Sequence, residues 1–270
     1  MPEGHTIHRA ARLQRKALRG KVVRADSPQG RFADGAAILD GQELVTVEAY
    51  GKHLFYRWSR GDTLHIHLGL YGKFRTFAHA GGDPLPPATP GTRLRLVTDD
   101  RVLHLAGPTA CDLVDEPMRR RILDRLGPDP LRRDADPDRA WSALRRRTIP
   151  ISAALLDQSV LAGIGNVYRA EALFVDHLAP DRPARDVTRG EFDSLWDTMQ
   201  AMLVAGARAG RIVTVEPADV GVTSLGRIPA RERVYVYKRA GLPCRRCGTG
   251  VLAGTSALRT IYWCPTDQPR

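Results

Sequence analysis

The sequence predicts a multidomain α+β protein: an N-terminal helix with an antiparallel β-sandwich, then a helical region, then a small cysteine-bearing β ribbon. Three observations support this order. Short runs of alternating apolar and polar residues fill the N-terminal part of the chain. Apolar residues at helical spacing dominate the middle, and three of the four cysteines lie between Cys244 and the C-terminus.

The N-terminal part is expected to begin with one helix, over residues 4–18, where Ile7 and Leu18 fall on one helical face. About seven β-like runs follow within roughly 100 residues, a density typical of an antiparallel sandwich or barrel. The runs are KVVRA, ELVTVEAY, HLFYRW, TLHIHLGL, KFRTF, RLRLVT and RVLHLAG. The Pro- and Gly-rich segment 81–91 is predicted to be a loop outside the sheet.

Near residue 117 the alternating β-like runs give way to Pro-broken and helical segments, and this change marks the predicted domain boundary. The helix-and-sandwich domain is expected over 1–117 and a Pro-broken linker over 118–136. A helical domain is then expected over 137–228 and the cysteine-bearing ribbon over 232–270.

The helical domain contains several segments with apolar residues at helical spacing. The last of them begins with Thr188 and carries Glu191 three residues later, which is the spacing of a capping box. The predicted helices are 137–146, 152–160, 166–175 and 188–208.

The chain is strongly basic, with 41 Lys and Arg against 30 Asp and Glu, a formal charge of +11 and a pI near 10.0. Such an excess suits a polyanionic partner, because neutralising phosphates releases condensed counterions. Solubility alone is the alternative explanation of the charge. No apolar run approaches the roughly 20 residues that span a bilayer. The N-terminus lacks the layout of a signal peptide, so we expect a cytoplasmic protein that does not bind membranes.

The cysteines favour a metal site over a disulfide framework, because they cluster in one segment of an expected intracellular protein. The segment has the spacing C-x2-C-x16-C-x2-D and supplies Cys244, Cys247, Cys264 and Asp267. Structural zinc sites prefer Cys and His ligands. Three options therefore stay open: a Cys3Asp site, a weaker three-ligand site, or a metal-free ribbon. The remaining Cys111 is expected to be a small buried apolar residue.

The second residue offers unusual chemistry. Once Met1 is removed, Pro2 carries a free secondary amine, and an α-amino group has a pKa of roughly 7.7–8.0. Such an amine can attack a sugar C1′ and form an iminium. The carboxyl group of Glu3, the next residue, can act as a proton donor. Many proteins begin with Met-Pro, so this pair indicates nothing by itself.

Two other features suit contact with phosphate. The glycines before Asn166 predict a tight turn into a helix whose free amides can bind a phosphate, although an ordinary helix start explains them too. Lys52 follows Gly51 at the edge of a predicted strand, and His67 ends another. Without further context, Lys52 reads as a solvated lysine and His67 as a packed strand residue.

Taken together, the motifs resemble the formamidopyrimidine-DNA glycosylase/endonuclease VIII family. They occur in one order from residue 2 to about residue 268: MPEGHT, GKHL, HLGLYG, QSVLAGIGNVYRAEALF and the CxxC…YWCP end. The resemblance implies a β-sandwich, a helix–two-turns–helix domain and a C-terminal zinc finger. It also implies a bifunctional glycosylase and lyase that binds damaged or abasic double-stranded DNA as a monomer, in a basic cleft between domains.

The resemblance assigns a role to each matched residue. Pro2 would be the nucleophile and Glu3 the acid, assisted by Lys52. Leu70 and Tyr71 would fill the gap left by a flipped nucleotide, as exposed apolar residues can; from the residues alone, Leu70 equally suits a core position. The residues expected to grip phosphates are Lys52, His67, Asn166 and Arg259.

Three departures from the family pattern matter. Thr6 stands where a second acid is usual, so the role of that acid is lost or moved. His5 replaces a proline, and Gly69 replaces a bulkier residue. The Gly4-His5 version is similar to endonuclease VIII-like members, which favours oxidised pyrimidines and abasic sites as substrates. Formamidopyrimidine-type purine specificity, or binding without catalysis, is the alternative.

Overall fold

The computed structural model describes residues 2–269. The chain divides into two compact units, Met1–Asp124 and Arg125–Arg270, called unit 1 and unit 2 below. The division falls within the segment 118–136 that the sequence predicts to be a linker.

Unit 1 contains an antiparallel sheet with the strand order β5-β7-β6-β1-β2-β3-β4-β8. Three helices accompany the sheet: α1 (Gly4–Leu18), α2 (Ala33–Leu39) and α3 (Glu116–Asp124). The strands are β1 (Val22–Asp26), β2 (Gln42–Tyr50), β3 (His53–Trp58), β4 (Thr63–His67), β5 (Lys73–Ala78), β6 (Thr92–Val97), β7 (Arg101–Ala106) and β8 (Ala110–Val114).

The sheet folds into a sandwich because β1 belongs to both of its layers. Val22 and Val23 pair with β2, whereas Arg24–Asp26 pair with β6. The buried faces of both layers then meet in one core, in which Leu54 and Ile66 from one layer accompany Leu96 and Leu105 from the other. The predicted antiparallel sandwich is confirmed.

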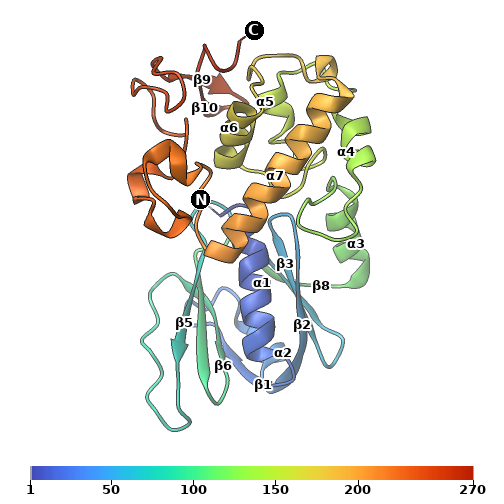
Figure 1. Ribbon diagram of the computed structural model, residues 1–270. Helices are drawn as coiled ribbons and strands as arrows, with labels where there is room; N and C mark the ends of the chain where they lie inside the picture. Colours follow the sequence, from blue (N-terminus) through green and yellow to red (C-terminus); the bar gives the residue numbers. More distant parts are fainter. Residues whose placement is uncertain (1, 270) are drawn as a thin grey trace. The chain divides into compact units, whose positions relative to one another are not determined.

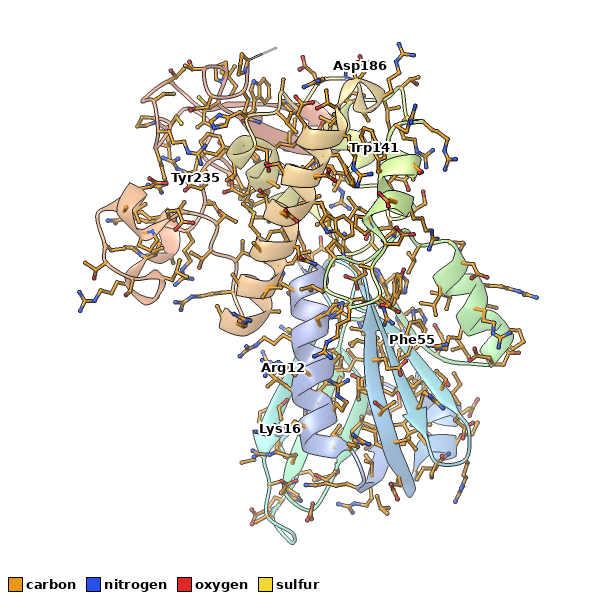
Figure 2. The ribbon with its side chains drawn as sticks, turned by 45° about the vertical axis from the view of Figure 1, so that its right-hand side comes forward. Arg12, Lys16, Phe55, Trp141, Asp186 and Tyr235 are labelled. Carbon is orange, nitrogen blue, oxygen red and sulfur yellow. The ribbon has the colours of Figure 1, made fainter. Side chains whose placement is uncertain are left out.

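Helix α1 packs against this core by one face (Figure 1). Ile7, Ala11 and Leu18 are buried on that face, as their spacing predicts. Arg12 and Lys16 lie one turn apart on the exposed side (Figure 2). This packing fixes the N-terminal end of α1, and with it the position of residues 2–6.

Unit 2 contains two further apolar clusters, one among its helices and one beneath its β ribbon. The predicted capping box is present, since Thr188 and Glu191 cap the long helix α7 reciprocally. The elements are α4 (Pro137–Leu144), α5 (Ile151–Ala154), α6 (Asn166–Val175), η1 (Ala184–Asp186), α7 (Arg189–Ala209), η2 (Pro217–Val220), η3 (Leu225–Arg227), η4 (Ala230–Glu232), β9 (Leu252–Ser256) and β10 (Arg259–Trp263).

Some element predictions were wrong. The helix expected over 152–160 is the single turn α5, because the chain leaves the helix after Ala154 to form the loop that precedes Asn166. Helix α2 and strand β8 were not predicted. Both are short, and only Ala36 and Leu39 of α2 and Cys111 of β8 are buried. Cys111 is 3% exposed, as expected for a small core residue.

No helix in the described part of the chain is long and apolar enough to cross a membrane.

Candidate active site

Pro2 lies at the wall of a cavity in unit 1. The cavity has a volume of about 520 Å³, and Thr6, Arg9 and Gln14 of α1 line it together with Leu70. Glu3 is the N-cap residue of α1 and is fully buried, at 0% exposure. The half-buried Pro2 therefore lines the cavity, and the buried Glu3 follows it at the start of α1.

His5, in the first turn of α1, is also buried. Burial, together with the positive charge of the amino terminus, lowers the pKa of His5 to about 4. The ring is therefore neutral at pH 7, and its Nε2 lies 3.1 Å from the hydroxyl oxygen of Thr6. Thr6 replaces the usual second acid, so the cavity wall carries a neutral hydroxyl here, in contact with the neutral ring of His5.

Lys52 and His67 lie close to each other at one end of the β3–β4 hairpin. Lys52 occupies the β2–β3 turn, and the next residue, His53, pairs with His67 across the strands. Burial lowers the pKa of His67, and the charge of Lys52 lowers it further. The neutral His67 ring accepts a hydrogen bond at Nδ1 from the backbone N–H of Gly69, 3.2 Å away. Its proton is therefore on Nε2, which can donate to an anion.

Leu70 and Tyr71 project from the turn that follows β4. Leu70 is 49% exposed and Tyr71 is 85% exposed, so the alternative of a core position for Leu70 is wrong. Glycine is required on both sides of the pair. Gly69 has a φ of +64°, and a Cβ on Gly72 would lie 2.2 Å from the carbonyl oxygen of Leu68.

The first turn of α6 begins at Asn166, as predicted. Gly165 is its N-cap residue and offers no side-chain cap, so the first amides of α6 lack a side-chain acceptor from that residue. The side chain of Asn166 is 7% exposed, and its Nδ2 donates to the carbonyl oxygen of Thr260 at 3.0 Å. This hydrogen bond ties the start of α6 to the β9–β10 hairpin.

The exposed Arg259 is the first residue of β10. A two-residue turn of Ala257 and Leu258 precedes it, and both residues have positive φ, +50° and +59°. Asn166 and Arg259 thus lie on neighbouring parts of unit 2, whereas Lys52 and His67 belong to unit 1.

The four predicted metal ligands come together at the base of the ribbon. One ligand atom from each of Cys244, Cys247, Cys264 and Asp267 lies within 4.8 Å of all the others. The Sγ atoms of Cys247 and Cys264 are 3.4 Å apart, and Cys244 Sγ lies 3.0 Å from Asp267 Oδ2. A tetrahedral site with zinc–sulfur bonds of about 2.3 Å separates its sulfur atoms by roughly 3.8 Å. This donor set fits a divalent metal ion, and the cysteines form no disulfide.

Sequence reasoning missed two charged residues of α6. Glu171 is buried and accepts hydrogen bonds from the hydroxyl of Thr214 and from three consecutive backbone N–H groups, those of Tyr235, Val236 and Tyr237. Arg169 is equally buried, at 0% exposure. Helix α6 is buried on every side from Asn166 to Phe174, and charged residues inside such an apolar helix are the signal that could have revealed both.

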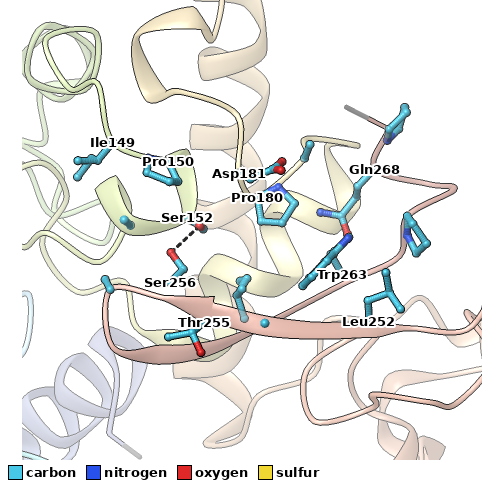
Figure 3. A pocket seen from close by; sticks show the side chains of 17 residues that line it. Ile149, Pro150, Ser152, Pro180, Asp181, Leu252, Thr255, Ser256, Trp263 and Gln268 are labelled. Carbon is cyan, nitrogen blue, oxygen red and sulfur yellow. Dashed lines mark hydrogen bonds between the residues drawn. The ribbon is translucent and has the colours of Figure 1, made fainter.

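A second, larger cavity of about 990 Å³ lies in unit 2, between the α5 region and the β9–β10 hairpin (Figure 3). Pro150, Pro180 and Trp263 line it, and a hydrogen bond of 2.8 Å between the hydroxyls of Ser152 and Ser256 connects its two sides.

The comparisons with known proteins agree with this architecture. Residues 1–111 match the family described as "Formamidopyrimidine-DNA glycosylase N-terminal domain". Residues 126–216 match "Formamidopyrimidine-DNA glycosylase H2TH domain".

The chain is 44% identical to "Endonuclease 8 1" of Mycobacterium tuberculosis over 99% of this chain and 100% of that protein. The solved structure of MutM (Fpg) from Thermus thermophilus superposes with a TM-score of 0.78 at 31% identity, covering 99% and 98% of the two chains. A structure of Lactococcus lactis Fpg with abasic-site DNA has a TM-score of 0.80, covering 99% and 100%. At 22% identity, that likeness shows the fold alone.

Proposed function

The chain belongs to the formamidopyrimidine-DNA glycosylase/endonuclease VIII family and is a DNA glycosylase and abasic-site lyase of base excision repair; within this activity, we propose that Pro2 is the covalent nucleophile and Glu3 the acid. One observation carries the proposal. Pro2 lines a cavity large enough for a nucleotide fragment and directly precedes the buried carboxyl group of Glu3, the N-cap residue of α1.

The chemistry requires a free amine at Pro2, and hence removal of Met1, which lies outside the described residues. The Pro2 nitrogen forms a bond to C1′ of the damaged nucleotide while Glu3 protonates the sugar ring oxygen, so that the bond from C1′ to that oxygen breaks and the ring opens. The Pro2 nitrogen loses its proton to solvent, the bond from C1′ to the base breaks as an iminium forms between Pro2 and C1′, and the base takes up a proton from solvent. The iminium acidifies C2′–H, and two successive eliminations expel the 3′ and then the 5′ phosphate.

Each unit supplies groups suited to phosphate. In unit 1, Lys52 offers a charge, assists Pro2 electrostatically, and lies beside the Nε2–H of the neutral His67. In unit 2, Arg259 offers a planar fork, and Asn166 begins α6, where the positive end of the helix dipole favours an anion. We propose that these four residues grip the phosphates around the lesion.

The exposed pair Leu70 and Tyr71 is proposed to fill the vacancy left by the flipped nucleotide. An apolar side chain placed between base steps offsets part of the cost of unstacking them. The glycines on both sides of the pair support this role, because they hold the two side chains on a tight turn instead of in the core.

For the lesion, we propose oxidised pyrimidines and abasic sites. Identity is higher to the mycobacterial Endonuclease 8 1, at 44%, than to the Thermus formamidopyrimidine-type enzyme, at 31%. The Gly4-His5 start, which is similar to that of endonuclease VIII-like members, supports the same choice.

Zinc is the metal proposed for the ribbon, with Cys244, Cys247, Cys264 and Asp267 as ligands. Zinc bound there would have a structural role, joining the two ends of the ribbon that carries Arg259. We further propose a monomer that works on chromosomal DNA in the cytoplasm, with the domain division 1–117, 137–228 and 232–270.

Borohydride trapping tests the nucleophile. Processed protein is mixed with an abasic duplex and sodium borohydride, and a covalent adduct that maps to Pro2 is expected. A matched preparation that retains Met1 should form no adduct, because its Pro2 nitrogen is an amide. Absence of the adduct in the processed protein would leave only DNA binding without catalysis.

Cleavage of duplexes that carry 5-hydroxyuracil, 8-oxoguanine or an abasic site tests the lesion class. Faster cleavage at 5-hydroxyuracil than at 8-oxoguanine is expected, and the reverse order would move the chain to the purine-directed branch.

A further inference from the structure

Arg169 occupies a position that stability alone does not favour. It lies in the first turn of α6 and is fully buried, at 0% exposure. Burial removes the guanidinium from water, and the positive end of the helix dipole opposes a cation there. A residue that carries both penalties calls for a compensating role.

The contacts of Arg169 point to the β9–β10 hairpin. Its Nη1 donates to the carbonyl oxygen of Ser152 at 2.8 Å. Its Nη2 lies 3.4 Å from the carbonyl oxygens of Ser256 and Thr260. Ser256 and Thr260 stand on either side of the hairpin turn, so one planar fork links α5 to both strands.

The turn between these two strands is strained. Ala257 and Leu258 both adopt positive φ, which glycine, asparagine and aspartate tolerate far better than alanine or leucine. Leu258 is 97% exposed, so its side chain gains little from packing. The surroundings must therefore hold this conformation in place.

Apolar packing and polar contacts both hold the hairpin. Ile261 is buried in one apolar cluster with Ala170 and Phe174 of α6, whereas the 990 Å³ cavity separates much of the hairpin from the α5 region (Figure 3). Polar contacts join the hairpin to α5 and α6. The hydroxyl of Ser152 is hydrogen-bonded to that of Ser256, and the side chain of Asn166 donates to Thr260. Each of these bonds reaches one strand, whereas Arg169 contacts both strands.

We propose that Arg169 is a positioning residue for DNA binding. Through the carbonyls of Ser256 and Thr260 it holds the hairpin turn, so that Arg259 projects toward the phosphate from a fixed place. Its buried charge also adds to the positive potential at the start of α6. This inference rests on the proposed phosphate contact of Arg259.

A double-mutant cycle between Arg169 and Arg259 tests the inference. The dissociation constant is measured for a duplex with a tetrahydrofuran abasic analogue, using Arg169→Met alone, Arg259→Ala alone and the two combined. Arg169→Met is expected to weaken binding about tenfold, as loss of charge-assisted hydrogen bonds can. In the Arg259→Ala background the same change should cost less than about twofold.

Two further variants separate positioning from folding. Arg169→Lys keeps the buried charge but loses the fork, and should weaken binding by about threefold, again only while Arg259 is present. Arg185→Met removes an exposed arginine from η1 and should leave binding unchanged. The rate of borohydride trapping at saturating protein should stay near that of the unaltered protein in all Arg169 variants, because Pro2 and Glu3 belong to unit 1.

The outcomes are distinct. Equal weakening by Arg169→Met in both backgrounds would mean that Arg169 acts on the stability of unit 2, and the inference would be overturned. Full affinity in Arg169→Met would overturn it as well. If Arg259→Ala alone has no effect, the proposed phosphate grip fails, and the inference fails with it.

Discussion

Glu3 and His5 show how one helix start can place a carboxyl group and a neutral imidazole beside the proposed nucleophile. Both are buried, Glu3 as the N-cap residue of α1 and His5 in its first turn. Burial disfavours the charged form of the His5 imidazole and lowers its pKa, so this ring is held toward its neutral form. An acid and a neutral ring next to an amine suit chemistry that opens a sugar ring at neutral pH.

Glu3→Gln should separate the two activities. Base removal from an intact nucleotide requires protonation of the ring oxygen, so excision of 5-hydroxyuracil should fall by about 10²-fold or more. An abasic site already equilibrates with its open aldehyde, so trapping of Pro2 on abasic DNA should persist. Single-turnover assays on both duplexes measure the split. Equal loss on both duplexes would show that Glu3 acts after the base has left.

His5 should make stability depend on pH. Its pKa falls from 6.5 in the unfolded chain to about 4 in the folded one, so the unfolded state binds more protons between those values. The contribution is fully present above pH 6.5 and is lost as the pH falls toward 4, by on the order of 3 kcal/mol in the free energy of unfolding. His5→Asn should flatten urea unfolding midpoints across this window. His79→Asn, at the end of β5, is the control and should retain the slope.

At the scale of elements, the turn between β4 and β5 depends on glycine. Gly69 has a φ of +64°, and a Cβ there would lie 1.9 Å from the hydroxyl oxygen of Thr109. Gly69→Ala should therefore lower the free energy of unfolding by about 2 kcal/mol or more and displace Leu70 and Tyr71. Gly30→Ala is the matched control, since Gly30 has a φ of +82° but no atom within 4 Å of its Cβ position. Equal losses in both variants would mean that backbone strain alone explains the effect.

The ribbon should bind one zinc ion through its four ligands. Removal of the metal with a chelator is expected to lower the melting temperature, because binding to a folded site stabilises the fold that contains it. Asp267→Cys should raise the zinc affinity, since thiolate suits a structural site better than carboxylate does. Metal content per chain and competition with a chromophoric chelator measure both. If Cys264→Ser retains full zinc content, the proposed ligand set is wrong.

The elements that the sequence predicted well are those with a sustained periodic pattern. Helices α1, α6 and α7 have one, and their observed ends lie within a residue or so of the expected ones. The helix expected over 152–160 failed because apolar residues in a buried loop resemble helical spacing. Helix α2 and strand β8 were missed because each is short and buries few side chains.

For the whole molecule, the sequence predicted which residues form the candidate site better than it predicted their contacts. The four metal ligands converge, as their spacing suggested, and Lys52 lies close to His67. The hydrogen bond from Asn166 to Thr260 and the buried contacts of Arg169 were not foreseen. They join α6 to a hairpin about 90 residues later, and no local pattern records a packing relation of that range.

The basic charge of the chain should appear in the salt dependence of DNA binding. Unit 1 and unit 2 each carry more Lys and Arg than Asp and Glu, and the logarithm of the binding constant should fall linearly with the logarithm of salt concentration. Lys52→Gln and Arg259→Gln should each reduce the slope by about 0.9, because each removes one phosphate contact. Lys16→Gln removes an exposed charge on α1 that has no proposed contact, and its slope should not change. Titrations of an abasic-analogue duplex between about 50 and 200 mM salt provide the slopes. A slope that falls equally in all three variants would mean that DNA responds to net charge and not to a gripped phosphate.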